Sequence, residues 1–378
     1  MSGFLKPVPI RKHTGIQALL VRQMNANKKR NTTHLENGEK APVLWGWHTY
    51  LSIAITLVVL AILASMVDLD KVWHEVAACD TKYVLLGMLA HYGTYPVRGI
   101  RWRRCLIHLS VGAGNARFGL LVFFYNFVDN VVPAKLGDIY GAHVARINCG
   151  IRRSTALGSI VFLRMVDAWV VLILAVLASW LLFSGRLPKV VLWALIGGAI
   201  IAAAATVIML AVFLLKRPLP GWLPKRVLEM IQAFRTGMWP RKKEIIPVAL
   251  LTVGIWGLET LWIFLLALGF GLKLSVAEAV FLTMIPVLAT AFPITPSGAG
   301  VVELTLFTCL RVVGIASPLA TSLTVVNRFI DYWLHIGLGI LIWAMRGVLG
   351  LRTWREVPPE DFRAAHPSRS LVGQEDVS

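Results

Sequence analysis

Charged residues are scarce in this sequence, and acidic residues are the scarcer kind. Only 15% of the 378 residues are charged, whereas soluble globular domains contain about 25%. Hydrophobic residues make up 57% of the chain, and the mean hydropathy is +0.68. This composition excludes an ordinary soluble enzyme. It also leaves no stretch without apolar runs that is long enough for a separate catalytic domain.

Cysteine is also sparse, and the usual catalytic motifs are missing. The four cysteines, Cys79, Cys105, Cys149 and Cys309, are scattered without CxxC spacing and indicate neither a disulfide framework nor a zinc site. The sequence contains no HExxH, GxSxG or Walker A motif, and its histidines are dispersed. We therefore predict no catalytic residue, no metal and no cofactor, and an ATP-driven pump would need another subunit.

Long apolar runs are what the sequence does contain. A membrane-spanning helix needs about 20 apolar residues, and suitable runs lie at 47–67, 82–100, 154–184, 189–216, 244–270 and 317–346. Two pairs of shorter segments, 119–132 with 138–149 and 279–292 with 301–313, predict re-entrant or broken-helix hairpins. We expect an all-α polytopic membrane protein with about six full transmembrane helices plus these two hairpins.

The distribution of charge predicts the orientation. Segments 98–117 and 216–243 are basic and 68–82 is mainly acidic, which places both basic segments and both termini in the cytoplasm. The segment 216–243 is predicted to lie on anionic inner-leaflet lipid, in preference to nucleic acid. We expect a multi-pass protein in the plasma membrane of a prokaryote. The predicted parts are a basic cytoplasmic tail (1–46), a transmembrane domain (47–346) and a largely disordered cytoplasmic tail (347–378).

The two predicted hairpins belong to an internal repeat, with motifs in 117–184 and 279–346. In the first, Pro133-x-x-x-Gly137 and Asp138 precede Arg164-x-x-Asp167; in the second, Pro296-x-x-x-Gly300 and Glu303 precede Arg328-x-x-Asp331 at nearly the same distance. On the predicted orientation the two motifs enter the membrane from opposite faces. Such an inverted repeat is typical of transporters with a central binding site.

Each motif places an arginine near the middle of a span. An arginine there costs about 2.5–3.5 kcal/mol, so Arg164 and Arg328 should face the bundle interior or a wet cavity. Asp167 and Asp331, three residues on, lie on the same helix faces. Two interpretations stay open: buried ion pairs that fix helix packing, or arginines that bind a lipid phosphate with the aspartates as counter-charges.

The breaks within the hairpins predict a second way of attracting an anion. Prolines end the first half of each hairpin and glycines permit tight turns, so a following half-helix would point its first amides into the cavity. Plain Pro-Gly loops are the alternative. The residues concerned are Pro133 and Gly137, then Pro293, Pro296, Gly298 and Gly300. Weaker candidates for lining a cavity are His91, Tyr92, Tyr95, Asn126, Asp129, Asn130 and Glu259.

The motifs resemble those of the lysylphosphatidylglycerol synthase transmembrane-domain family. The resemblance covers roughly 50–345 and rests on FVDNVVPAKLGDIYGAHVAR, FPITPSGAGVVE and VVNRFIDYW. Family members include the flippase half of the multiple peptide resistance factor. The family motif positions correspond to Pro133, Gly137, Asp138, Arg164, Asp167, Pro296, Gly300, Glu303 and Arg328. Departures are Ala134-Lys135, Gly141 and Ser297, where the family commonly has an arginine, a basic residue and a Gly-Gly pair.

The resemblance implies a translocase without the synthase domain, so a separate lipid-modifying synthase is a candidate partner. We expect a flippase or scramblase that binds a phospholipid or other lipid-linked phosphate at Arg164, Asp167, Arg328 and Asp331. Asp138, Glu303 and Lys135 would contact the headgroup or orient the hairpins. The alternative is a membrane-embedded transferase acting on a polyisoprenyl-linked or phospholipid substrate. The oligomeric state stays open.

Overall fold

The computed structural model is helical throughout the residues that it describes, which are 69–109, 111–131, 136–214, 224–290, 298 and 300–352. The predicted span 47–67 and both predicted tails, apart from 347–352, lie outside these residues. So do Pro133, Lys135, Pro293 and Pro296.

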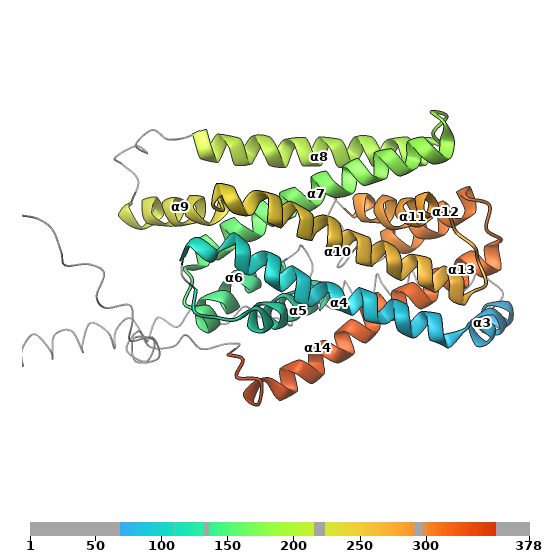
Figure 1. Cartoon of the computed structure of the whole chain (residues 1–378), viewed down its shortest axis with the longest axis horizontal. Helices are drawn as coiled ribbons and strands as arrows, with labels where there is room; N and C mark the ends of the chain where they lie inside the picture. Colours follow the sequence, from blue (N-terminus) through green and yellow to red (C-terminus); the bar gives the residue numbers. More distant parts are fainter. Residues whose placement is uncertain are drawn as a thin grey trace, which may run out of the picture. The chain divides into compact units, whose positions relative to one another are not determined.

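Figure 1 shows the described helices in their order along the chain. They are α3 (Leu69–Ala78), α4 (Thr81–Cys105), α5 (Asn115–Val131), α6 (Leu136–Cys149), α7 (Arg153–Phe183), α8 (Lys189–Leu214), α9 (Lys225–Met238), α10 (Lys242–Gly269), α11 (Val276–Ala289), α12 (Val301–Val312), α13 (Ser317–Arg328) and α14 (His335–Ala344). A π-helical segment, Phe329–Leu334, joins α13 to α14 without interruption.

Four helical stretches among the described residues are long and apolar enough to cross a membrane. They are Arg153–Phe183, Lys189–Val212, Lys242–Gly269 and Ser317–Gly347, and each coincides with a predicted span. Large apolar side chains on their outer faces remain exposed, including Trp180, Trp193, Ile208, Leu250 and Leu341. Soluble monomers rarely leave so much apolar surface uncovered. The chain is therefore a multi-pass helical membrane protein.

The two predicted hairpins appear as pairs of short helices. α5 packs against α6, and α11 packs against α12. α4 and α10 run side by side, and Figure 1 shows the α5–α6 pair toward one end of these two helices and the α11–α12 pair toward the other. α7 contacts both α6 and α11, so it connects the two pairs.

One sequence-based boundary is wrong in a way that matters for the site. The segment 98–117 was expected to be a basic cytoplasmic stretch, but α4 continues through Pro96 to Cys105. Arg101 is buried within that helix and Arg98 is largely covered. These two arginines neutralise acids inside the bundle, so they do not report the orientation of a loop.

The helix α11 begins with a capping box that gives a modest stability prediction. The Ser275 hydroxyl accepts from the Glu278 amide at 3.2 Å, while the Glu278 carboxylate accepts from the Ser275 amide at 2.7 Å. Ser275→Ala should lower the free energy of unfolding by about 1 kcal/mol. Thermal unfolding in detergent checks this, with Ser275→Asn as the control that keeps a cap and a near-unchanged midpoint. An equal loss in both variants would contradict the capping role.

Candidate functional site

A cavity of about 530 Å³, here called the central cavity, is lined by residues of α4 to α8, α10, α11 and the π-helical segment. Apolar side chains of α8 and α11, such as Ile201 and Leu288, form part of its lining. The charged and titratable part consists of His91, Tyr95, Arg98, Asp138, Arg164, Asp167, Glu259 and Asp331. Charges at membrane depth are stable only when they face one another or water. The central cavity is therefore the candidate site.

Arg164 lies in the cavity wall and is held by two acids of the first hairpin. α7 begins at Arg153, so Arg164 lies about 16 Å along the helix axis. Its Nη2 donates to Asp138 Oδ1 at 2.9 Å and to Asp129 Oδ2 at 3.4 Å, and its Nε donates to Asp138 Oδ2 at 3.2 Å. The side chain stays 39% exposed. The Arg164 guanidinium is therefore held in place by the two acids and remains accessible.

The second motif makes the corresponding ion pair. Arg328 Nε lies 2.7 Å from Glu303 Oε1, and its guanidinium stacks over the Tyr332 ring at 4.2 Å. In both motifs, therefore, the arginine pairs with the acid in the first turn of the second hairpin helix. These ion pairs favour a role for Asp138 and Glu303 in orienting the two arginines, in preference to contact with a cationic headgroup.

The expected pairing of each arginine with the aspartate three residues later is wrong. Asp167 instead forms a bidentate ion pair with Arg101. The Arg101 Nη1 donates to Asp167 Oδ1 at 2.5 Å, and Nη2 donates to Oδ2 at 3.0 Å. Asp331 lies 3.5 Å from the Nε2 atom of His91. Both partners belong to α4, which thus links the two motifs. A spacing of three residues places the arginine and the aspartate on one face of the helix. The side chains of α4 nevertheless reach the two aspartates and form the observed ion pairs with them.

The two motifs differ in what they present to the cavity. Arg328 is only 4% exposed and does not line the central cavity, and Glu303 is buried beside it. Arg164, Asp138, Asp167 and Asp331 do line it. The structure thus brings four of the predicted binding residues together and leaves Arg328 and Glu303 as a buried pair.

The glycines at the hairpin breaks serve different purposes. Gly298 and Gly300 have φ angles of 66° and 84°, which favour glycine, and the Gly300 amide donates to Glu303 Oε2 at 2.7 Å. Gly137 lies in the first turn of α6, and its amide donates to Asp129 Oδ1 at 2.8 Å. A Cβ there would meet Asp129 and the Tyr125 carbonyl oxygen. Gly137 is thus needed for close packing and not for a turn.

Sequence reasoning missed Arg98 of α4 as a residue of the cavity, whereas His91, Tyr95 and Glu259 are among the residues that it predicts to line one. Arg98 Nη2 donates to Glu259 Oε1 at 3.0 Å, and His91 Nδ1 lies 2.9 Å from Glu259 Oε2. The signal was present, because His91, Tyr95 and Arg98 recur at helical spacing on one face. The basic segment predicted over 98–117 includes Arg98, and this prediction separates Arg98 from the polar stripe of His91, Tyr92 and Tyr95.

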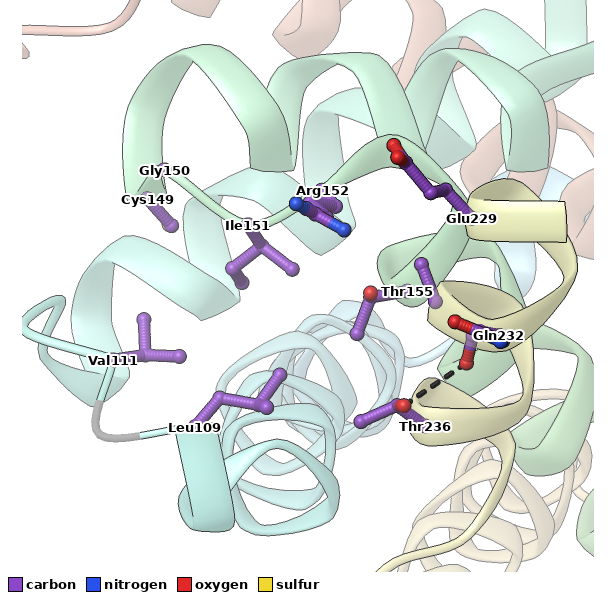
Figure 2. Close-up of a pocket in the computed structure, with 11 residues that line it drawn as sticks. Leu109, Val111, Cys149, Gly150, Ile151, Arg152, Thr155, Glu229, Gln232 and Thr236 are labelled. Carbon is purple, nitrogen blue, oxygen red and sulfur yellow. Dashed lines mark hydrogen bonds between the residues drawn. The ribbon is translucent and has the colours of Figure 1, made fainter. Parts of the chain in front are cut away.

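A second cavity, of about 380 Å³, lies between α9 and the turn that connects α6 to α7 (Figure 2). Gln232 and Thr236 of α9 line one side, and Gly150–Arg152 of the turn line another. Burial raises the pKa of the Cys149 thiol in its wall to about 12, so that thiol is not a nucleophile. No residue of either repeat motif lines this cavity.

Among the described residues, no group of three His, Cys, Asp or Glu side chains has metal-binding geometry.

Comparison with known proteins gives consistent matches. Residues 50–339 match the family model described as the lysylphosphatidylglycerol synthase TM region. A UPF0104 membrane protein of Methanocaldococcus jannaschii is 27% identical over 218 residues, which is 57% of this chain and 92% of that protein. A second one from the same archaeon is 23% identical over 318 residues, 78% of this chain and 93% of that protein. A UPF0104 membrane protein of Pyrococcus horikoshii is 20% identical over 330 residues, 79% of this chain and 98% of that protein. No solved structure matches the chain.

Proposed function

We propose that this chain, which belongs to the lysylphosphatidylglycerol synthase transmembrane-region family, is a lipid translocase. It moves a phospholipid or other lipid-linked phosphate headgroup between leaflets through the central cavity, as a flippase or scramblase. The observation that carries the proposal is the cavity itself, because it joins an accessible arginine to apolar walls that come partly from candidate membrane-spanning helices.

The size of the central cavity favours a headgroup. Binding sites for small molecules have volumes of about 300–1,000 Å³, and about 530 Å³ falls within that range. Two acyl chains would not fit beside a headgroup in such a volume. The chains would remain in the bilayer while the polar part passes through the protein.

Arg164 is the group best suited to bind the phosphate. Its Nε and Nη2 atoms are directed at Asp138 and Asp129, whereas its Nη1 atom makes no hydrogen bond with the described residues. A guanidinium presents its donors in a fixed fork, and a phosphate oxygen would use the remaining donors. The two acids keep the empty site from carrying excess positive charge.

We propose the predicted arrangement of about six spans and two re-entrant hairpins, related as an inverted repeat. The matching ion pairs Arg164–Asp138 and Arg328–Glu303 support a repeat, since equivalent residues make equivalent contacts. The positions of the two short-helix pairs in Figure 1 support opposite orientations. Alternating access around a central site would follow from such symmetry.

We also propose that α9 lies on the cytoplasmic membrane surface against anionic inner-leaflet lipid. Gly158 and Gly237 let α9 approach α7 closely, because a Cβ at either glycine would collide with a backbone carbonyl. Arg226, Met230 and Trp239 remain exposed, a mixture of basic and apolar groups that suits a membrane interface.

A separate lipid-modifying synthase is the proposed source of a modified lipid substrate.

Reconstitution in liposomes tests the translocase proposal. The wild-type protein should make a fluorescent phospholipid in the inner leaflet accessible to a reductant added outside. Arg164→Ala should slow this at least about ten-fold, since an anion held by charge-assisted bonds loses about 1.5–3 kcal/mol. Arg164→Lys should fall in between, because it keeps the charge without the fork.

Arg186→Ala is the matched control, since Arg186 is exposed in the turn between α7 and α8. An unaltered rate in a correctly folded Arg164→Ala protein would contradict the phosphate-binding role. A wild-type protein that moves no lipid but turns over a polyisoprenyl-linked donor would establish the transferase alternative instead.

A further inference from the structure

His91 lies between two carboxylates that come from different parts of the fold. Its Nδ1 atom is 2.9 Å from Glu259 Oε2 on α10, and its Nε2 atom is 3.5 Å from Asp331 Oδ1 in the π-helical segment. The imidazole is 5% exposed, whereas the Asp331 side chain is 42% exposed. Both the central cavity and a neighbouring cavity of about 220 Å³ are lined by all three residues. The cluster thus forms a shared wall with access to water.

The position of His91 fixes how its ring must be protonated. A carboxylate accepts hydrogen bonds and cannot donate them, so Nδ1 beside Glu259 carries a hydrogen. In a neutral imidazole Nε2 would then hold only a lone pair, pointing toward the Asp331 carboxylate. Nε2 has no hydrogen-bond partner among the described residues. A second proton at Nε2 converts this repulsion into an attraction.

The neighbouring charges favour that second proton. Arg98 donates to Glu259 and contributes one positive charge against the two carboxylates, so the cluster carries one net negative charge while His91 is neutral. Protonation of His91 brings the sum to zero. The other titratable groups facing the ring are Tyr92 and Tyr95 on α4 and His335 on α14, whose Nδ1 is 3.0 Å from the Tyr95 hydroxyl.

We infer that His91, Glu259 and Asp331 form a proton-binding site that couples movement of the lipid to movement of a proton. The proton binds at His91 Nε2 from water in the central cavity and returns to water when it leaves. No covalent bond other than N–H is made or broken. The inference rests on the proposed translocase function, since that function supplies the cargo to be coupled.

The contacts of Asp331 show how the proton would affect both hairpins. A protonated His91 holds Asp331 against α4, and a neutral one releases it toward the cavity. The adjacent Tyr332 hydroxyl donates to the Asn130 carbonyl oxygen of the first hairpin at 3.1 Å. Arg328, one helical turn earlier, pairs with Glu303 of the second hairpin. π-helical segments are rare in proteins, and those that occur are frequently found at functional sites. The Tyr92 hydroxyl of α4 donates a hydrogen bond to the Ile330 carbonyl oxygen in the π-helical segment that carries Asp331.

Proton binding is tested directly, without lipid transport. Nitrogen NMR of histidine-labelled protein in lipid nanodiscs gives the protonation state of each imidazole, and loss of a signal in His91→Gln assigns His91. We expect a doubly protonated His91 at pH 6 that loses its proton at higher pH. Asp331→Asn should shift this titration to lower pH, because one of the two carboxylates no longer attracts the proton. A His91 that stays neutral from pH 5 to 9 would overturn the site.

Coupling is tested in liposomes with an imposed pH difference and no membrane potential. One proton per lipid and a difference of one pH unit should drive about a ten-fold ratio of a trace fluorescent phospholipid between leaflets. His91→Gln and Asp331→Asn should lose this ratio, and any lipid movement that remains in them should ignore the pH difference. Asp331→Asn guards against misfolding, because its side chain is partly exposed and nearly isosteric. His74→Gln, on the exposed part of α3, is the matched control.

The outcomes separate the two proposals. Lipid movement that ignores the pH difference would overturn the coupling and leave the translocase function standing. A wild-type protein that moves no lipid would overturn both the translocase function and the coupling, while the NMR titration would still decide whether His91 binds a proton.

Discussion

Replacement of Arg101 by alanine should be among the most destabilising single changes in the described part of the chain. Arg101 makes the two-pronged ion pair with Asp167, and its Nη1 also donates to the Thr252 hydroxyl at 2.9 Å. Trp256 donates to the same Asp167 carboxylate at 3.2 Å. α4, α7 and α10 therefore meet at one buried charge pair.

Removal of Arg101 leaves the Asp167 carboxylate buried without its cation. Loss of one partner of such a pair costs about 3–5 kcal/mol. We expect Arg101→Ala to lower the thermal midpoint in detergent by roughly 10 °C. Arg186→Ala, which removes an exposed arginine, should leave the midpoint within about 1–2 °C.

A double variant distinguishes charge from packing. Arg101→Leu combined with Asp167→Leu removes both charges and keeps apolar volume, so it should be more stable than Arg101→Leu alone. If the double variant were as unstable as the sum of the two single variants, the buried charge would not be the cause.

Gly99→Ala should separate α4 from the first hairpin. A Cβ at Gly99 would collide with the Gly119 amide nitrogen of α5 and would lie 2.8 Å from the Phe118 carbonyl carbon. Backbone atoms cannot rotate away as a flexible side chain can, so the helices themselves must move apart. Overpacking of a core costs about 1–3 kcal/mol or more, and a backbone clash falls at the upper end.

The same helix offers a matched control in Gly93, where an added Cβ would meet nothing within 4 Å. Gly93→Ala should be neutral or stabilising by up to about 1 kcal/mol, because alanine favours a helix. Thermal unfolding and limited proteolysis of both variants check the pair of predictions. Equal stability of the two variants would show that α4 and α5 are not in close contact at Gly99.

The internal repeat illustrates what spacing alone can predict. The order of proline, glycine, acid and R-x-x-D is visible in the sequence, and the structure places the glycine and acid of each motif at the start of a short helix that is followed by a long helical stretch. The four apolar stretches within the described residues also coincide with predicted spans. The length of an apolar run and the order of residues in a motif are set by residues close together in the sequence. Both can therefore be predicted without knowledge of tertiary contacts.

The pairing of charges illustrates what spacing could not predict. Arg101 and Asp167 are separated by 66 residues and Arg98 and Glu259 by 161. Any arginine attracts any carboxylate, and the choice between them depends on which helices pack together. The sign of their charge alone predicts that Arg98 and Arg101 belong to a cytoplasmic segment, which is wrong because both pair with acids inside the bundle.

Residue order and composition are enough to identify a helical membrane protein of this family, with a motif that occurs twice. Helix packing places Arg164 at a cavity and buries Arg328, and it makes α4 the source of the partners of both aspartates. The physical reason is that apolar length and helical period are properties of the local chain. Accessibility and ion pairing are properties of the space between helices.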